Sequence, residues 1–220
     1  MTKATDSFLM TDAEIEDFFK ILQDLNPQPR GELTYVNPFT LLVSVVLSAQ
    51  ATDKSVNLAT PALFAVADTP QKMIALGQEK IQEFIKKIGF SSIKSKYIMT
   101  LSHQLIDQYQ GEVPQTIEQL MQLSGVGRKT ANVVLNIAFQ QPTLAVDTHV
   151  FRVSNRTGLA PGATPDKVEQ NLLKRVPQNF LFNAHHWLIL HGRYICKAIK
   201  PQCYICPVKK LCHYPSKTLL

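Results

Sequence analysis

Apolar residues recur at helical spacing along most of this chain. After Thr11, the apolar residues follow the i, i+3, i+4, i+7 pattern of one buried helix face: Ile15, Phe18, Phe19 and Leu22. Glu14 stands three residues after Thr11, which is the spacing of a capping box. The pattern therefore predicts an amphipathic helix that begins at this cap and ends near Asn26.

A long, almost uninterrupted apolar run extends from Phe39 to Gln50. Its β-branched valines would suit a strand, but the run lacks alternation and continues through the helix-compatible segment AQATDKSVNLA. A helix that is apolar nearly all round is buried on all sides. We therefore expect a buried helix here.

Further apolar stripes and caps predict helices along the rest of the chain. A stripe from Ile81 to Ile88 should end at Gly89, and Ser91 or Ser92 should cap a helix that ends before Gly111. More helices are expected over residues 61–67, 71–76, 114–123, 166–176 and 182–192. Neither a β-hairpin nor a nucleotide-binding glycine pattern after a strand is evident, so the sequence predicts an almost wholly helical protein.

The stretch LSGVGRKTANVVLN, residues 123–136, combines two glycines with two basic residues. Gly125 and Gly127 stand between two helical segments, which indicates a helix, a tight hairpin and a second helix. The free N–H groups at the start of the second helix form a site for an anion such as a nucleic-acid phosphate. Lys129 lies just inside that helix beside Arg128, and the hairpin alone leaves two roles open for it: a phosphate contact or a reactive amine.

Composition and charge narrow the class of protein. The 220 residues are 45% hydrophobic, which is enough for one large domain or two interleaved ones. The net charge of +6 favours a polyanionic partner, with a solvated basic surface as the alternative. The uncharged stretch 33–52 is interrupted by Asn37 and Pro38, which disfavours a membrane span, and acidic residues near the N-terminus argue against a signal peptide. We expect a soluble, cytoplasmic protein.

The cysteines form one cluster. Six, two and five residues separate Cys196, Cys203, Cys206 and Cys212. In a reducing cytosol, such a cluster indicates a metal site rather than disulfides. Both zinc and an iron–sulfur cluster take four thiolates, but zinc more often uses two separated close pairs, so the spacing favours iron–sulfur and leaves zinc open. The nearby histidines lack a second ligand set and are expected to pack: His185, His186 and His191.

Several stretches together resemble the endonuclease III family, the helix-hairpin-helix DNA glycosylases and apurinic/apyrimidinic (AP) lyases. They are LLVSVVLSAQATD, GVGRKTANVVLN, AVDTHVFRV, HHWLILHGR and the cysteine spacing, and the likeness extends from about Leu25 to Cys212. It implies an all-α fold of two lobes. A six-helix lobe over residues 31–140 would hold the hairpin, and a discontinuous helical lobe, residues 1–30 plus 141–220, would hold a 4Fe-4S cluster on the four cysteines.

The resemblance implies two catalytic residues, Lys129 and Asp147. Lys129 would attack C1′ of the sugar, expel the damaged base and form a Schiff base that leads to β-elimination. Because the attacking amine must be neutral, Arg128, the helix N-terminus and partial burial should favour that form. Asp147 would stabilise the positive charge that develops on the sugar, or assist proton transfer. Its position also suits a helix N-cap, and the two roles are compatible.

The resemblance also implies contacts with DNA. Gln50 would enter the gap opposite the extruded nucleotide. Phe90 stands where a relative has a leucine wedge, so the residue type differs while an apolar group is kept. The other expected contacts come from the hairpin and from two basic positions: Gly125, Val126, Gly127, Arg128, His149 and Lys200.

The predicted function is that of a bifunctional DNA glycosylase and AP lyase in base excision repair. It would remove oxidised pyrimidines from duplex DNA and cleave 3′ to the abasic site. The predicted partner is damaged double-stranded DNA, bound by a monomer that needs no membrane and no obligate protein partner and that would associate with the nucleoid. Two alternatives remain: an adenine DNA glycosylase relative, although its hairpin normally lacks the lysine at 129, and a non-catalytic DNA-binding protein with a structural metal.

Overall fold

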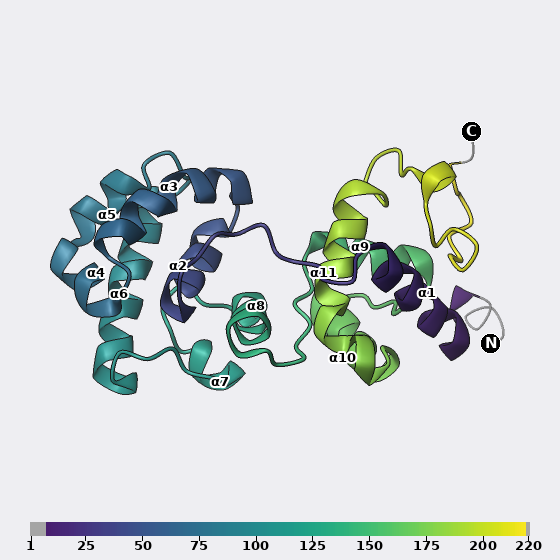
Figure 1. Cartoon of the computed structure of the whole chain (residues 1–220), viewed down its shortest axis with the longest axis horizontal. Coiled ribbons are helices and arrows are strands. Elements are labelled where there is room, and N and C mark those ends of the chain that lie inside the picture. Colours follow the sequence, from purple (N-terminus) through teal and green to yellow (C-terminus); the bar gives the residue numbers. More distant parts are fainter. Residues whose placement is uncertain (1–7, 219–220) are drawn as a thin grey trace. The chain divides into compact units, whose positions relative to one another are not determined.

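The described part of the chain is helical. The computed structural model describes residues 8–218, and within them it has eleven α-helices, short 3₁₀ turns and no strand (Figure 1). The predicted all-α class is confirmed. The chain divides into two compact units, of which unit 1 comprises Met1–Arg30 with Pro142–Leu220 and unit 2 comprises Gly31–Gln141. None of the described helices is both long enough and apolar enough to cross a membrane.

Unit 2 is organised around α2. Its helices are α2 (Pro38–Ser48), α3 (Asp53–Val66), α4 (Pro70–Leu76), α5 (Gln78–Phe84), α6 (Ser91–Tyr109), the single-turn α7 (Ile117–Leu120) and α8 (Arg128–Phe139). Helix α2 packs against α3, α6 and α8, which explains why every residue from Phe39 to Leu47 is buried. The prediction of a buried helix is confirmed.

The end of α2 differs from the prediction. The helix stops at Ser48, and Gln50 adopts a left-handed backbone with φ of 54°. Thr52 then caps α3 by accepting a hydrogen bond from the amide of Ser55 at 3.2 Å. A polar turn therefore interrupts the segment that we expected to continue as helix.

Unit 1 packs its helices around an aromatic core. Its helices are α1 (Asp12–Leu25), α9 (Thr148–Thr157), α10 (Pro165–Arg175) and α11 (Gln178–Tyr194), followed by the 3₁₀-helix η2 (Cys203–Ile205). Helix α11 packs against α9 and α1. Trp187 of α11 lies among the rings of Phe19 and Phe180, and its indole Nε1 donates to the carbonyl of Asn26 at 2.8 Å. This bond fastens the end of α1 to α11.

The predicted cap of α1 is confirmed. The amide of Thr11 donates to Glu14 Oε2 at 2.7 Å, and the amide of Glu14 donates to Thr11 Oγ1 at 3.3 Å. The helix ends before Asn26, as expected.

Several other boundaries were predicted wrongly. Residues 61–67 are not a separate helix, because Pro61 lies inside α3. Helix α5 ends at Phe84 rather than Gly89, and the buried Ile85 and Ile88 follow it in turns. No serine side chain caps α6, because Phe90 occupies the cap position in a left-handed conformation. Of residues 114–123, only Ile117–Leu120 is helical.

Candidate functional site

The predicted hairpin leads directly into α8. Gly125 has φ of 76°, and a Cβ added there would lie 2.9 Å from the ring of Tyr97. Gly127 has φ of −96° and occupies the N-cap of α8 without a side-chain hydrogen bond, and an added Cβ would meet nothing within 4 Å. The first glycine is therefore needed for the shape of the turn. The second leaves no side chain across the first amides of α8.

The basic residues of the hairpin are exposed. Arg128 and Lys129 are the first two residues of α8, and both side chains are open to solvent. The expected partial burial of Lys129 is therefore wrong for the unbound protein, because the helix begins at a surface turn. Val126 is buried, with 7% of its surface exposed, so a DNA contact at this position has to use its backbone.

Gln50 and Phe90 occupy two other exposed turns of unit 2. Both are non-glycine residues in the left-handed region, with φ of 54° and 61°. Such a backbone is uncommon outside glycine and often marks a functional turn. Phe90 keeps 60% of its surface exposed, which leaves its ring available as an apolar probe.

Asp147 is the N-cap of α9, as predicted. Its Oδ1 accepts hydrogen bonds from the amides of His149 at 2.9 Å and Val150 at 2.8 Å. Its Oδ2 takes part in neither bond. One carboxylate oxygen thus fixes the helix start and the rotamer of Asp147.

His149 has a partner within unit 1. Its Nδ1 lies 3.1 Å from Nη2 of Arg152, one turn later in α9. Arg152 also donates from Nη2 to the carbonyl of Gly192 at 2.8 Å and from Nε to the carbonyl of Cys196 at 3.0 Å. This network holds the imidazole in place, so a DNA contact by His149 would use its other ring edge.

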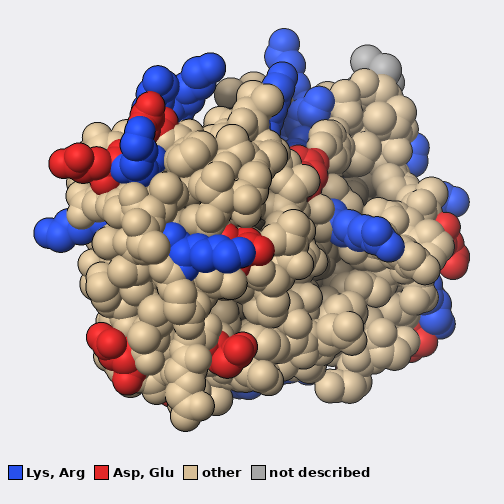
Figure 2. Space-filling view, turned by 60° about the vertical axis from the view of Figure 1, so that its left-hand side comes forward, with Lys and Arg blue, Asp and Glu red and all other residues tan. Residues whose placement is uncertain are grey.

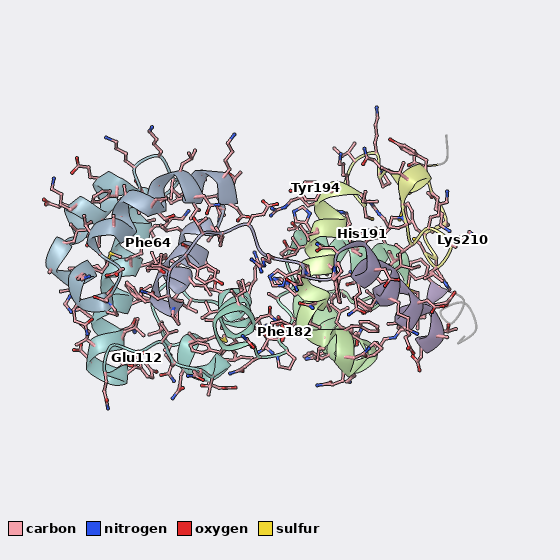
Figure 3. The ribbon with its side chains drawn as sticks, viewed as in Figure 1. Phe64, Glu112, Phe182, His191, Tyr194 and Lys210 are labelled. Carbon is pink, nitrogen blue, oxygen red and sulfur yellow. The ribbon has the colours of Figure 1, made fainter. Side chains whose placement is uncertain are left out.

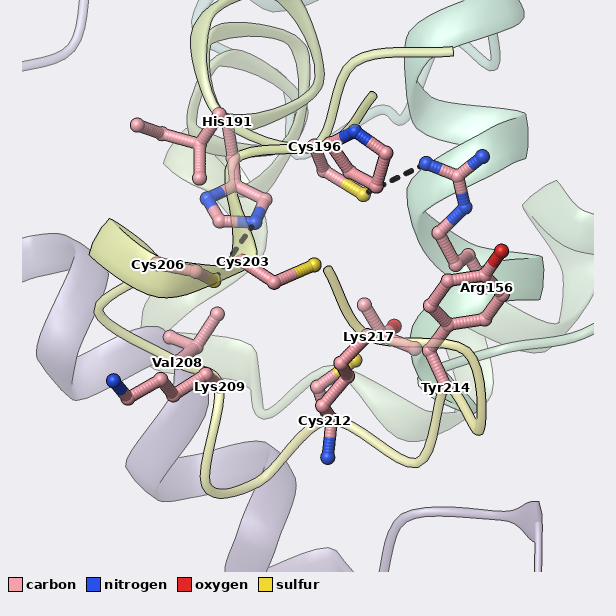
Figure 4. A pocket seen from close by; sticks show the side chains of 13 residues that line it. Arg156, His191, Cys196, Cys203, Cys206, Val208, Lys209, Cys212, Tyr214 and Lys217 are labelled. Atoms are coloured by element: carbon pink, nitrogen blue, oxygen red, sulfur yellow. Dashed lines mark hydrogen bonds between the residues drawn. The ribbon is translucent and has the colours of Figure 1, made fainter. Parts of the chain in front are cut away.

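The four cysteines line one pocket in unit 1. The space is about 350 Å³ and partly open to solvent, and the four sulfur atoms point into it (Figure 4). None of the cysteines forms a disulfide. Lys200 lies in the loop between the first two cysteines, exposed and left-handed with φ of 50°.

Arg156 of α9 braces the loop that follows Cys196. Its Nη1 lies 3.6 Å from Cys196 Sγ and donates to the carbonyl of Lys197 at 2.7 Å, while Nη2 donates to the carbonyl of Ala198 at 3.2 Å. The guanidinium also lies 5.0 Å from the ring centroid of Tyr214. The loop is thus attached to α9 by several bonds from one side chain.

Burial shapes the chemistry of the pocket. It raises the pKa of Cys206 to about 11 and also raises the pKa of Cys212. His191, whose Nε2 lies 3.8 Å from Cys206 Sγ, has its pKa lowered by burial to about 4. Figure 3 labels His191 on α11. Its ring packs edge-on against that of Phe18, with 6.2 Å between the ring centroids, as expected of a core histidine. Burial therefore favours the protonated form of Cys206 and Cys212, whereas a positive centre would favour their thiolates.

The shape of the pocket bears on which centre it fits. Among residues 8–218, no three His, Cys, Asp or Glu side chains converge closely enough to hold a single ion. The thiols instead surround a shared space (Figure 4). Four thiols around one space are a donor set that both zinc and an iron–sulfur cluster take.

One face of the molecule carries charges of both signs (Figure 2). On the face that Figure 2 shows, Lys and Arg side chains are spread among acidic ones. The net charge of +6 therefore does not by itself mark a binding surface on this face.

Comparisons with known proteins agree with this geometry. The model of the HhH-GPD superfamily base excision DNA repair proteins matches residues 43–178. Endonuclease III of Rickettsia conorii is 58% identical over 200 residues, which cover 91% of this chain and 95% of the relative. Endonuclease III of Escherichia coli K12 is 53% identical over 196 residues, which cover 89% and 93%. This chain belongs to the endonuclease III family.

A solved structure supports the same membership of the endonuclease III family. It is a trapped endonuclease III–DNA covalent intermediate in an estranged-adenine complex, and it matches with a TM-score of 0.87 at 44% identity. The match covers 93% of this chain and 96% of that one. The predicted two-lobed helical fold of the family is thus confirmed.

The sequence did not reveal the contacts of three residues in this endonuclease III family member. Arg156 contacts a loop some 40 positions away in sequence, and His191 reaches a cysteine as well as packing. Lys94 of α6 is buried. The apolar pattern of the sequence did not predict this burial, because apolar periodicity does not identify a polar residue inside a core. All three depend on which segments pack together.

Proposed function

We propose that this endonuclease III family member removes oxidised pyrimidines from duplex DNA and cleaves the resulting abasic site by covalent catalysis through Lys129. The observation that carries the proposal is the exposed lysine in the first turn of the hairpin helix α8, in a chain whose fold matches a trapped protein–DNA covalent intermediate. Family membership makes the chain a base excision DNA repair protein.

The reaction begins with a neutral Lys129 amine. Its nitrogen lone pair forms a bond to C1′ of the sugar, and the glycosidic bond breaks, with its electron pair leaving on the base. Loss of a proton from nitrogen and opening of the sugar ring give a Schiff base. A proton then leaves C2′, the C3′–O bond breaks, and the 3′ phosphate departs with that electron pair. Water releases the lysine.

The exposure of Lys129 limits what can favour the neutral amine that attacks C1′. In the free protein the amine is open to water. The environment that favours its neutral form therefore has to come from Arg128, from the partial positive charge at the start of α8 and from desolvation by bound DNA.

Asp147 acts electrostatically in this proposal. Oδ1 is committed to the amides at the start of α9, and this holds the carboxylate in one rotamer. A carboxylate fixed in this way stabilises positive charge on the sugar without reorganising during the reaction. Helix capping and catalysis are thus compatible roles of one side chain.

DNA binding uses backbone amides, basic side chains and two probes. The uncapped start of α8 at Gly127 accepts a phosphate, and Arg128, Lys200 and the free edge of His149 add contacts to the DNA backbone. Gln50 fills the gap left by the extruded nucleotide, and Phe90 separates neighbouring bases. The partner is damaged duplex DNA, bound by a monomer in the bacterial cytoplasm.

The cysteine pocket holds a 4Fe-4S cluster in this proposal. Cys196, Cys203, Cys206 and Cys212, which line one pocket, supply the four thiolates. When bound, the cluster braces the loop that carries Lys200. Arg156 then stabilises the negative charge of the thiolate of Cys196.

Borohydride trapping on a duplex with an abasic site tests the proposal. The intact chain should become covalently attached, whereas Lys129→Ala should not. Lys54→Ala, which removes another exposed lysine of unit 2, is the matched control and should trap like the intact chain. Trapping that persists in Lys129→Ala would contradict the nucleophile, and a chain that binds the duplex without trapping would be a non-catalytic binder.

A further inference from the structure

Lys94 is a buried cation in unit 2. Only 4% of its surface is exposed, and its Nζ donates a hydrogen bond to the carbonyl of Leu47 at 2.9 Å. Burial lowers the pKa of this amine. Lysine is rarely buried without a polar partner, because removal of the charged group from water is costly. Its position therefore needs a reason in the structure.

The partner of Lys94 is the frayed end of α2. In a continuing helix, the carbonyl of Leu47 would accept from the amide of Ala51, but that amide donates instead to the carbonyl of Ser48 at 3.0 Å. The ammonium group thus satisfies a carbonyl at the negative end of the helix dipole. It does so where the chain leaves α2 and enters the left-handed turn at Gln50.

The backbone of Lys94 is bonded to the other exposed turn. Its amide donates to the carbonyl of Phe90 at 2.9 Å, in the first turn of α6. Like Gln50, Phe90 is a non-glycine residue in the left-handed region. A single residue is therefore tied to both turns, through its side chain at Leu47 and through its backbone at Phe90.

We propose that Lys94 is a positioning residue that fixes the Gln50 turn against the Phe90 turn, so that both side chains engage one lesion. A non-glycine residue stays in the left-handed region only where its surroundings hold it there. Lys94 supplies such a hold at the end of α2, because α2 and α6 are in contact and their side chains leave Lys94 little access to water. This inference rests on the proposed function, which assigns Gln50 and Phe90 to DNA.

Lys94 does not serve as a second nucleophile. Its amine is enclosed and bonded to Leu47, so it cannot reach a sugar without unfolding the end of α2. Borohydride should therefore trap nothing when Lys129 is replaced, even though Lys94 remains.

A double-mutant cycle tests the inference. The probes are a duplex with tetrahydrofuran, a stable abasic-site analogue, and the same duplex undamaged. Lys94→Met removes the donor and keeps the apolar stem, and it should weaken binding to the tetrahydrofuran duplex about tenfold while it changes binding to the undamaged duplex less than about twofold. When Gln50 is already alanine, adding Lys94→Met should weaken binding by less than about twofold, because Lys94 acts through that turn.

A fluorescent base analogue in the duplex reports the entry of Gln50 into the gap. With 2-aminopurine opposite the tetrahydrofuran, the intact chain should raise the fluorescence as Gln50 enters the gap, and Lys94→Met should raise it less. Lys94→Arg, which keeps a cationic donor, should restore most of the change. Ser102→Ala is the matched control, because Ser102 is also buried in α6 but its hydroxyl donates to Ile98 within the helix. It should change neither readout.

Some outcomes would overturn the positioning role. One is equal weakening on both duplexes, and another is a loss that is fully additive with Gln50→Ala. All binding is measured at a temperature at which circular dichroism shows the variant and the intact chain to be equally folded. If Lys94→Met does not fold, Lys94→Gln replaces it in the cycle. If the intact chain fails to trap, the proposed function falls separately, since the binding cycle does not depend on lyase chemistry.

Discussion

The hairpin that begins α8 is exposed and takes its shape from the backbone, whereas the cysteine pocket is lined by side chains from several segments. The hairpin needs one residue with a positive φ, Gly125, and the packing of one ring, Tyr97. The pocket draws on α9, α11 and the loop of four cysteines, and its thiols are free. The shape of the hairpin is therefore set by the chain alone.

In the cysteine pocket, by contrast, burial changes the chemistry of the side chains. Burial raises the pKa of Cys206 to about 11 and also raises the pKa of Cys212, so it favours the protonated form of these two thiols. Metal binding would release those protons and add to the stability of unit 1. The two regions should therefore respond to different changes.

The largest effect is expected from Cys206→Ala. Loss of one of the four proposed thiolate ligands should prevent full assembly of the proposed cluster. Because such a cluster would contribute folding free energy, the midpoint of thermal unfolding should fall by roughly 10 °C. Iron and sulfide analysis with calorimetry measures both effects. Tyr204→Ala, an exposed change in the same turn, is the control and should keep its iron. A variant that retains its full iron content would contradict the ligand assignment.

The next largest effect is expected from Gly125→Ala. A methyl group at φ of 76° and 2.9 Å from the ring of Tyr97 should cost about 1–3 kcal/mol of stability and weaken binding to an abasic duplex. Iron content should stay unchanged. Gly127→Ala is the matched control for stability, since its φ is ordinary and an added Cβ meets nothing. Urea unfolding of both variants measures the difference, and equal stabilities would show that the turn is not strained.

Smaller effects are expected from the basic residues in each region. Arg128→Ala at the hairpin and Lys200→Ala at the cysteine loop should each remove about one phosphate contact, so each should lower the slope of log affinity against log salt by about 1. Binding to damaged and undamaged duplexes should weaken by a similar factor, because phosphates carry no sequence information. Titrations at several salt concentrations measure the slope. A variant with an unchanged slope would not contact a phosphate.

Local signals explain how much of the fold the sequence revealed. The box of Thr11 and Glu14, the stripe behind it and the apolar run of α2 all lie within a few residues of the elements they specify. The cap at Phe90 failed as a prediction because a left-handed apolar residue took the place of a nearby serine. Pro61 led to a wrong boundary because proline usually begins or breaks a helix, whereas here it lies inside α3.

Some features of the candidate site could be predicted from local sequence patterns, and others could not. The hairpin glycines and the cysteine spacing are sequence patterns, so they could be found without a structure. Arg156 and Lys94 acquire their roles only when α9 meets the cysteine loop and α6 meets α2. No spacing rule within one segment reports such a pairing.

The smallest effect is expected from Glu14→Gln, which tests how α1 is joined to the segment after the last cysteine. Glu14 Oε2 accepts from the amide of Thr11, and Oε1 lies 3.0 Å from His213 Nε2. The hydrogen bond from Thr11, and then that from His213, hold the pKa of Glu14 below its usual value. The carboxylate therefore adds stability above the unfolded pKa of about 4.3, and this contribution is lost as pH falls through the lower folded value.

The expected loss in Glu14→Gln is about 0.5 kcal/mol at pH 7, because solvent screens the pair, and it should shrink towards zero near pH 3. Urea unfolding at both pH values measures the change. Glu16→Gln, which removes an exposed partner of Lys20 on the same helix, is the control and should show a smaller difference. A loss that stays the same at both pH values would assign the effect to side-chain shape rather than to the charge. Iron content should be unchanged in either variant, because neither Glu14 nor Glu16 lines the cysteine pocket.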